Sequence, residues 1–160
     1  MSRSLDPARE LRRAYLFAEM PDPYLLQLIG QMQDIHLSPG DSLFRHGQPA
    51  ERFFFLREGL VKLFRLSPEG DEKIIEIMRP GETFAEAVMF MGTQGRYPVS
   101  AEAVSDAKLY AFEQKKFLGM LHESSDACFG LLASMSRRLH MLVNQIESLT
   151  LQNATYRLVA

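Results

Sequence analysis

The chain has 160 residues, of which 46% are hydrophobic and 24% are charged, and its formal net charge at pH 7 is −2. This length suits one globular domain with an appended helix, and the apolar share excludes a disordered chain. A slightly acidic chain is also not expected to bind nucleic acids, because proteins that bind the phosphate backbone usually carry an excess of Lys and Arg. The single cysteine, Cys128, excludes a disulfide framework and a four-cysteine metal site within one chain.

Neither a membrane-spanning segment nor a signal peptide is predicted. The longest run without Asp, Glu, Lys or Arg is residues 23–33. A membrane helix needs about 20 apolar residues, so this run is too short. The N-terminal residues 1–6 contain no apolar stretch that resembles a signal sequence. We therefore expect a soluble, cytoplasmic protein with no membrane partner.

Residues 1–33 have helical periodicity. Asp6 followed by Pro7 is typical of a helix start, and the apolar positions Leu11, Tyr15 and Leu16 predict one short helix after it. The Met-Pro-Asp-Pro sequence at residues 20–23 ends this helix and starts a second one. The apolar stripe of the second helix consists of Leu25, Leu28, Ile29 and Met32.

Residues 34–113 have the pattern of an antiparallel β protein. From Gly47 to Gly92, glycines recur every eleven or twelve residues, and short segments rich in Val, Ile, Leu and Phe lie between them. The expected strands are residues 42–44, 53–56, 60–66, 73–78, 99–104 and 108–112. Such strands predict a sandwich or a barrel. The run Phe53-Phe54-Phe55 is expected to fill both faces of its strand.

Residues 83–91 interrupt this pattern with Ala and Met and predict a short helix after a turn at Pro80-Gly81. The first amides of a helix that begins near Ala85 would be free to bind an anion. Glu86 could then accept hydrogen bonds from sugar hydroxyls, and Arg96 in the following loop could pair with a phosphate. The alternative is that Glu86 complements the helix dipole and Arg96 is a solvent-exposed loop residue.

Residues 114–153 are helical again. A short helix covers residues 115–121, and Ser124-Ser125-Asp126 then caps a long helix. Apolar residues recur in the long helix at heptad spacing, which indicates a coiled-coil seam between two chains, with packing on its own barrel as the alternative. The predicted seam positions are Leu132, Leu139, Ile146 and Asn153 at a, with Met135, Leu142, Leu149 and Tyr156 at d.

No catalytic arrangement is recognisable, so we do not expect an enzyme. The sequence contains no nucleophile elbow, zinc-protease motif or phosphate loop. Cys128 is expected to be a small buried residue. The four histidines lack metal-ligand spacing; they are His36, His46, His122 and His140. Three basic pairs are typical of exposed faces: Arg12-Arg13, Lys115-Lys116 and Arg137-Arg138.

Several motifs, in this order, resemble the Crp/Fnr superfamily of bacterial transcription regulators. They are Leu16-Phe17, Leu43-Phe44-x-x-Gly47, Phe55-Leu56-x-x-Gly59-x-Val61-Lys62, Gly81-Glu82-x-Phe84-Ala85-Glu86, Ser134-x-Ser136-Arg137-Arg138-Leu139 and Thr155-x-Arg157-Leu158. The resemblance covers nearly the whole chain. It implies a mainly β fold with flanking helices, in which a cyclic-nucleotide-binding-like double-stranded β-helix (jelly roll) precedes a long helix that forms a parallel homodimer. It also implies a C-terminal helix-turn-helix domain that binds promoter DNA, of which residues 154–160 would be the start and the rest would be missing.

The resemblance further implies an effector pocket. In cyclic-nucleotide-binding members of the superfamily, the helix carries Gly-Glu and the loop carries Arg-Ser or Arg-Thr. Glu86 and Arg96 match this pattern. However, Ala85 replaces the glycine and Tyr97-Pro98 replaces the hydroxyl residue, which disfavours cyclic AMP or cyclic GMP. Residues 84–91 and 146–155 look most like the Dnr branch, whose members respond to nitric oxide through bound haem.

A pocket of the Dnr type would have an apolar edge formed by Phe84, Met89, Phe90 and Met91, which suits a porphyrin better than a phosphate. The expected pocket residues are Phe84, Ala85, Glu86, Met89, Phe90, Arg96, Tyr97, Leu139 and Val143. His140 is the candidate haem ligand that falls nearest the expected pocket, although its heptad position b favours a solvent-facing histidine. The sequence thus predicts the effector-sensing and dimerisation region of a regulator that responds to nitric oxide through haem. A cyclic-nucleotide-binding module and a ligand-free dimerisation module are the alternatives.

Overall fold

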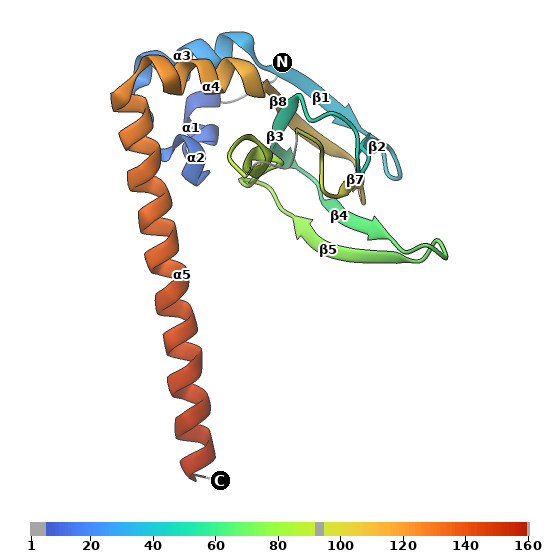
Figure 1. Ribbon diagram of the computed structural model, residues 1–160, viewed down its shortest axis with the longest axis vertical. Coiled ribbons are helices and arrows are strands. Elements are labelled where there is room, and N and C mark those ends of the chain that lie inside the picture. Colours follow the sequence, from blue (N-terminus) through green and yellow to red (C-terminus); the bar gives the residue numbers. More distant parts are fainter. Residues whose placement is uncertain (1–5, 92–94, 160) are drawn as a thin grey trace.

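The computed structural model describes residues 6–91 and 95–159. Two antiparallel sheets form a roll, short helices cover one end of it, and one long helix extends away from the body (Figure 1). The predicted fold class, a mainly β roll with flanking helices and a long C-terminal helix, is confirmed.

The first sheet has the strand order β1-β8-β3-β6 and the second has the order β2-β7-β4-β5. The strands are β1 (Gln33–Leu37), β2 (Ser42–Phe44), β3 (Arg52–Glu58), β4 (Val61–Leu66), β5 (Glu72–Met78), β6 (Thr83–Phe84), β7 (Ser100–Ala103) and β8 (Ala107–Glu113). The expected strands match all of these except β1 and β6. Strand β1 is mostly exposed and polar and β6 has two residues, so neither contains the apolar run that marks a strand in a sequence.

The run Phe53-Phe54-Phe55 fills both faces of β3, as predicted. Phe54 lies inside the roll, where its ring centroid is 5.7 Å from that of Phe44. Phe53 and Phe55 lie on the opposite face, under the helices, and the Phe53 ring is 5.2 Å from that of Phe117. Because side chains alternate along a strand, one strand contributes to two hydrophobic cores.

The helices are α1 (Pro7–Leu11), α2 (Tyr15–Ala18), α3 (Asp22–Gln31), the 3-10 turn η1 (Glu86–Met89), α4 (Gln114–Glu123) and α5 (Ser125–Val159). The prediction of one helix before residue 20 is wrong, because the chain turns between α1 and α2 to bury both Leu11 and Leu16. The cap of α5 is as predicted: the hydroxyl of Ser124 accepts the N–H of Ala127 at 3.1 Å.

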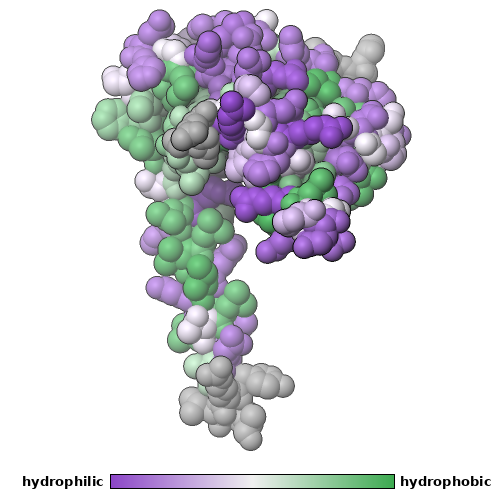
Figure 2. Space-filling view, turned by 45° about the vertical axis from the view of Figure 1, so that its right-hand side comes forward, coloured by the Kyte–Doolittle hydropathy of each residue, from purple (hydrophilic) through white to green (hydrophobic). Residues whose placement is uncertain are grey.

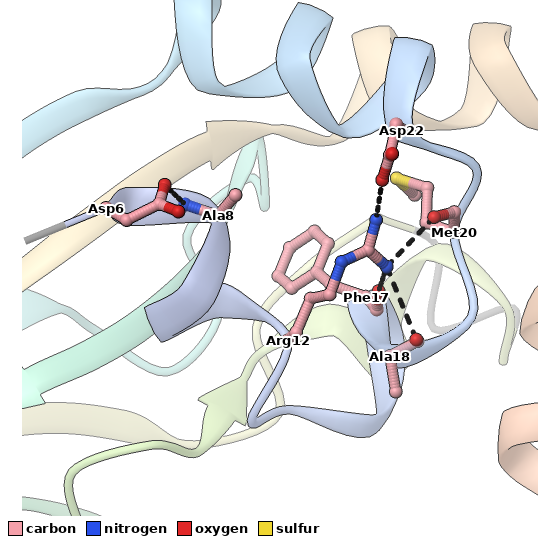
Figure 3. Close-up of polar contacts among 7 residues, drawn as sticks. All are labelled: Asp6, Ala8, Arg12, Phe17, Ala18, Met20 and Asp22. Atoms are coloured by element: carbon pink, nitrogen blue, oxygen red, sulfur yellow. Dashed lines mark hydrogen bonds and ion pairs between the residues drawn. The ribbon is translucent and has the colours of Figure 1, made fainter.

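Arg12 fastens the turn between α2 and α3 and does not form an exposed face, contrary to the prediction. One guanidinium nitrogen donates to three backbone carbonyl oxygens, and the other pairs with the carboxylate of Asp22 (Figure 3). The carbonyl groups belong to Phe17 (3.1 Å), Ala18 (3.3 Å) and Met20 (3.0 Å). These carbonyl groups lie at and just beyond the C-terminal end of α2, where a helix has few intrahelical donors left; that of Phe17 also accepts the N–H of Met20.

Helix α5 packs on α2 and α4 through its first turns and then leaves the body (Figure 1). Hydrophobic side chains gather along its free part (Figure 2). The predicted seam positions with described side chains are all exposed: Leu132, Met135, Leu139, Leu142, Ile146, Leu149 and Asn153. The side chain of Tyr156 lies outside the described residues. No helix in the described part of the chain is long and apolar enough to cross a bilayer.

Candidate functional site

A cavity of about 700 Å³ lies between the roll, the start of α2 and α5. Its apolar wall includes Phe44, Leu63, Met78, Phe84, Val88 and Val99. Its charged residues are Arg13, Arg65, Arg138, Glu76, Glu82 and Glu86. A volume of this size falls in the range of about 300–1,000 Å³ that small-molecule and cofactor sites occupy.

The backbone conformation of Ala85 separates β6 from the 3-10 turn that follows it in the cavity wall. Ala85 has φ of 69°, and among the described residues it is the one non-glycine residue with a positive φ. A left-handed conformation costs an alanine about 1–2 kcal/mol relative to the right-handed one. The expected helix over residues 83–91 is therefore shorter than predicted: residues 83 and 84 form β6, and after Ala85 only Glu86–Met89 turn as a 3-10 helix.

The carboxylate of Glu86 belongs to the lining of the cavity, and one of its two oxygen atoms has no hydrogen-bond partner. The residue is 9% exposed. Its Oε2 accepts a hydrogen bond from the hydroxyl of Tyr15 at 2.7 Å, whereas its Oε1 is buried and has no hydrogen-bond partner. Leaving a buried polar atom unpaired costs about 1–3 kcal/mol. A hydrogen-bond donor on a ligand would relieve this cost.

Tyr15 connects this carboxylate to α5. The guanidinium carbon of Arg138 lies 4.9 Å from the centroid of the Tyr15 ring, a cation–π contact between α5 and α2. Burial, followed by the negative charge of Glu86, raises the pKa of the Tyr15 phenol well above its usual value. The phenol therefore stays protonated and keeps donating to Glu86. Tyr15, Glu86 and Arg138 all line the cavity.

Arg65 and Arg13 hold positive charge at the edge of the cavity. The Nε of Arg65 donates to the carbonyl oxygen of Pro98 at 2.9 Å. The guanidinium of Arg13 lies against Gly81, where an added Cβ would come within 2.7 Å of an Nη atom. Arg13 also donates to the carbonyl oxygen of Pro80 at 3.4 Å, and among the described residues neither guanidinium is paired with a carboxylate, so both could pair with an anionic group of a ligand.

Some of the predicted pocket residues meet in this cavity. Phe84, Ala85, Glu86 and Tyr97 line it, as does Met91. The Tyr97 ring stacks on Phe44 with centroids 3.9 Å apart. Met89 and Phe90 are not among the lining residues; the first packs toward the helical core and the second is exposed.

The remaining predicted residues lie elsewhere in the structure. Arg96 is directed to the loop before β3, where its Nη1 donates to the carbonyl oxygen of Gly47 at 2.7 Å. Leu139, His140 and Val143 are exposed on α5 and do not line the cavity. The structure therefore does not bring Arg96 together with Glu86, nor His140 together with the apolar wall.

Four residues that line the cavity were not predicted as site residues from the sequence: Tyr15, Arg13, Arg65 and Arg138. Tyr15 is 71 positions from its partner Glu86, and Arg138 comes from a different helix. Only the tertiary fold unites them, so no local spacing could have revealed the set. Arg138 had one signal, its place in a motif that resembles the Crp/Fnr superfamily.

A metal cluster and a buried thiol are not part of this site. Among the described residues, no group of three or more His, Cys, Asp or Glu side chains could hold a metal ion. Cys128 is half-buried, so the expectation of a buried cysteine is wrong.

The family model for the cyclic nucleotide-binding domain matches residues 34–124. The CRP-like cAMP-activated global transcriptional regulator of Mycobacterium tuberculosis is 25% identical over 139 residues, which are 87% of this chain and 61% of that protein. The cAMP-activated global transcriptional regulator CRP of Pasteurella multocida is 29% identical over 125 residues, 78% of this chain and 59% of that protein. The chain thus spans about three fifths of the length of these curated relatives.

Solved structures of transcription regulators are also similar to this chain. The crystal structure of DNR from Pseudomonas aeruginosa has a TM-score of 0.86 and 38% identity, covering 99% of this chain and 70% of that chain. The sensor domain of the same regulator has a TM-score of 0.74 and 38% identity, covering 88% of this chain and 93% of that chain. These relatives are transcription regulators and not enzymes, as predicted. The chain belongs to the Crp/Fnr family of transcription regulators, as a sensor region built on a cyclic nucleotide-binding domain.

Proposed function

We propose that this chain is the effector-sensing and dimerisation region of a bacterial regulator that responds to nitric oxide through haem held in the cavity. The supporting observation is the combination of an apolar wall with arginines at its edge, between the roll and α5. Haem presents a flat apolar ring and two carboxylates, which match these two surfaces. When bound, it supplies an iron atom that takes up nitric oxide.

Particular residues suit particular parts of haem. Phe84 would contact the ring, and Arg13 and Arg65 would pair with its carboxylates. Among the described residues lining the cavity, the sulfur atoms of Met78 and Met91 are candidate iron ligands.

Two further groups are less well prepared to bind iron. Tyr15 is a weaker candidate because its raised pKa keeps the phenol protonated and its oxygen already donates to Glu86. His140 remains a predicted ligand, but it is exposed on α5 and does not line the cavity.

The proposed output is a change in dimer geometry. Arg138 lines the cavity and belongs to α5, whose exposed apolar residues we propose form a parallel two-chain seam. Movement of Arg138 would shift α5 and therefore the seam. We also propose the division into helices at 1–33, a sensor roll at 34–113 and dimerisation helices at 114–153. Residues 154–160 would lead into a helix-turn-helix domain that binds promoter DNA.

A haem titration tests this function. Adding haem to the purified chain is expected to give a saturable Soret band that shifts when nitric oxide is added. Arg65→Ala should weaken haem binding about tenfold, since a hydrogen bond to a charged group contributes about 1.5–3 kcal/mol. The control Arg45→Ala, an exposed residue outside the cavity, should bind haem like the parent protein. Absence of a saturable band contradicts the proposal.

A cyclic nucleotide is the second candidate ligand, and the unpaired Oε1 of Glu86 is the observation that favours it. A ribose hydroxyl could donate to this oxygen. Calorimetry with cyclic AMP and cyclic GMP tests this candidate. The alternative of a ligand-free dimerisation module predicts that neither nucleotide nor haem raises the melting temperature, because a ligand that binds the folded state must stabilise it.

A further inference from the structure

We infer that Tyr15 sets the ligand selectivity of the cavity by competing with ligand hydroxyl groups for the carboxylate of Glu86. This inference rests on the proposed function to the extent that the cavity must be the effector site. It concerns which class of effector the cavity admits: ligands that need Glu86 are disfavoured, and ligands that bind through the apolar wall and the arginines are not.

The geometry makes Tyr15 an internal substitute for a ligand hydroxyl. Its phenol oxygen lies 2.7 Å from Oε2 of Glu86, and both residues line the cavity. The other carboxylate oxygen, Oε1, is buried without a partner. A ligand hydroxyl that approached Oε2 would share that oxygen with the Tyr15 phenol or displace it. One that approached Oε1 would share a carboxylate whose other oxygen already accepts from Tyr15.

Tyr15 holds an advantage over a free hydroxyl because it is part of the same chain. Its hydrogen bond costs none of the translational and rotational freedom that a ligand loses on binding. The adjacent residues Leu16 and Phe17 are 2% and 0% exposed, which anchors α2 against the body. Arg138 lies over the ring of Tyr15 and limits its movement from the side of α5. Haem carries no hydroxyl donor, so Tyr15 does not compete with it.

The substitution Tyr15→Phe isolates this effect, because it removes the hydroxyl and keeps the ring under Arg138. Tyr24→Phe is the matched control: Tyr24 is a half-buried tyrosine on α3 that does not line the cavity. Cyclic AMP is a suitable probe because its ribose has one free hydroxyl, at the 2′ position. The 2′-deoxy analogue of cyclic AMP lacks that hydroxyl.

Calorimetry should show that Tyr15→Phe binds cyclic AMP at least about tenfold more tightly than the parent protein and Tyr24→Phe, the fold-change expected when a charged acceptor is released. The gain should be absent for the 2′-deoxy analogue. In a double-mutant cycle, the loss of cyclic AMP affinity caused by Glu86→Gln should be about tenfold larger with Tyr15→Phe than in the parent background. Haem affinity should be equal in all four proteins of the cycle.

Two results would overturn the inference. One is a Tyr15→Phe protein that keeps the circular dichroism spectrum of the parent and binds cyclic AMP no more tightly. The other is an equal gain for the 2′-deoxy analogue, which would show that the freed carboxylate is not the cause. A haem titration without a saturable Soret band contradicts the proposed function alone, since the nucleotide measurements do not depend on it.

Discussion

Gly130 on α5 packs directly against the backbone carbonyl of Glu19, the C-cap residue of α2, and a Cβ added at Gly130 would lie 2.5 Å from that oxygen. Further along α5, Arg137 forms an ion pair with the side chain of the same Glu19 at 2.7 Å. Helix α2, which carries Tyr15 into the cavity, is thus fitted closely to α5. A change in one should be transmitted to the other.

Gly130→Ala should lower the free energy of unfolding by about 1–3 kcal/mol, because overpacking forces backbone to move. Gly119→Ala is the control: Gly119 lies in α4 and an added Cβ would have nothing within 4 Å. That substitution should instead stabilise the protein by about 0.5–1 kcal/mol through helix propensity. Thermal unfolding of the two variants measures the difference, and equal melting temperatures would show that the α2–α5 contact is loose.

Leu142→Lys should convert dimers to monomers if the exposed heptad positions of α5 form the seam, because it places a charge at a central d position. Met141→Lys is the control, since Met141 is equally on the exposed helix but at position c. Light scattering coupled to size-exclusion chromatography gives the molar mass of each variant, and we expect a monomer for Leu142→Lys and a dimer for Met141→Lys. A Leu142→Lys dimer would mean that the chains associate through another surface.

Arg12→Ala should destabilise the protein by about 1.5–3 kcal/mol, because the guanidinium is a charged donor to several carbonyl groups. Arg12→Lys should recover little of this loss, since an ammonium group lacks the planar fork that spans these acceptors. Arg9→Ala, at an exposed position of α1, serves as the control. Urea unfolding gives the three values, and full recovery with lysine would contradict the role assigned to the fork.

Tyr15 should make stability depend on alkaline pH. Its folded-state pKa is raised, mainly by burial, so the neutral phenol is the form that the fold favours. Its contribution is therefore complete below the unfolded pKa of about 10 and is lost as the pH rises above that value. The stability difference between the parent and Tyr15→Phe should be constant near neutral pH and shrink above about pH 10. Urea midpoints across this range measure it, and a difference that grows with pH would refute the assignment.

The regular glycines and apolar segments predicted most of the roll, because short strands closed by turns leave a strong pattern in a sequence. They missed β1, where Asp34 and His36 face outward and only Leu37 is buried. They also merged α1 and α2, since a turn that buries residues on both sides keeps helical spacing. These failures share a cause: the deciding contacts are made with other elements and not with sequence neighbours.

The candidate site was predicted in part for the same reason. Glu86 follows a recognisable change of pattern and was identified, but the backbone at Ala85 directs it toward α2 and not toward Arg96. The positions of Tyr15 and Arg138 depend on how two helices dock on the roll. Such docking is decided by shape, as at Gly130, and a single sequence does not encode shape in any local spacing.

A single strand, β3, separates the hydrophobic core inside the roll from the core under the helices. Its residue Phe54 packs in the first core, and its neighbours Phe53 and Phe55 pack in the second. Neither core can rearrange alone, because a shift of Phe54 moves the backbone that also holds the other two rings. The two ends of the molecule should therefore unfold in a single cooperative transition, and a tryptophan placed in either core should report the same denaturation midpoint.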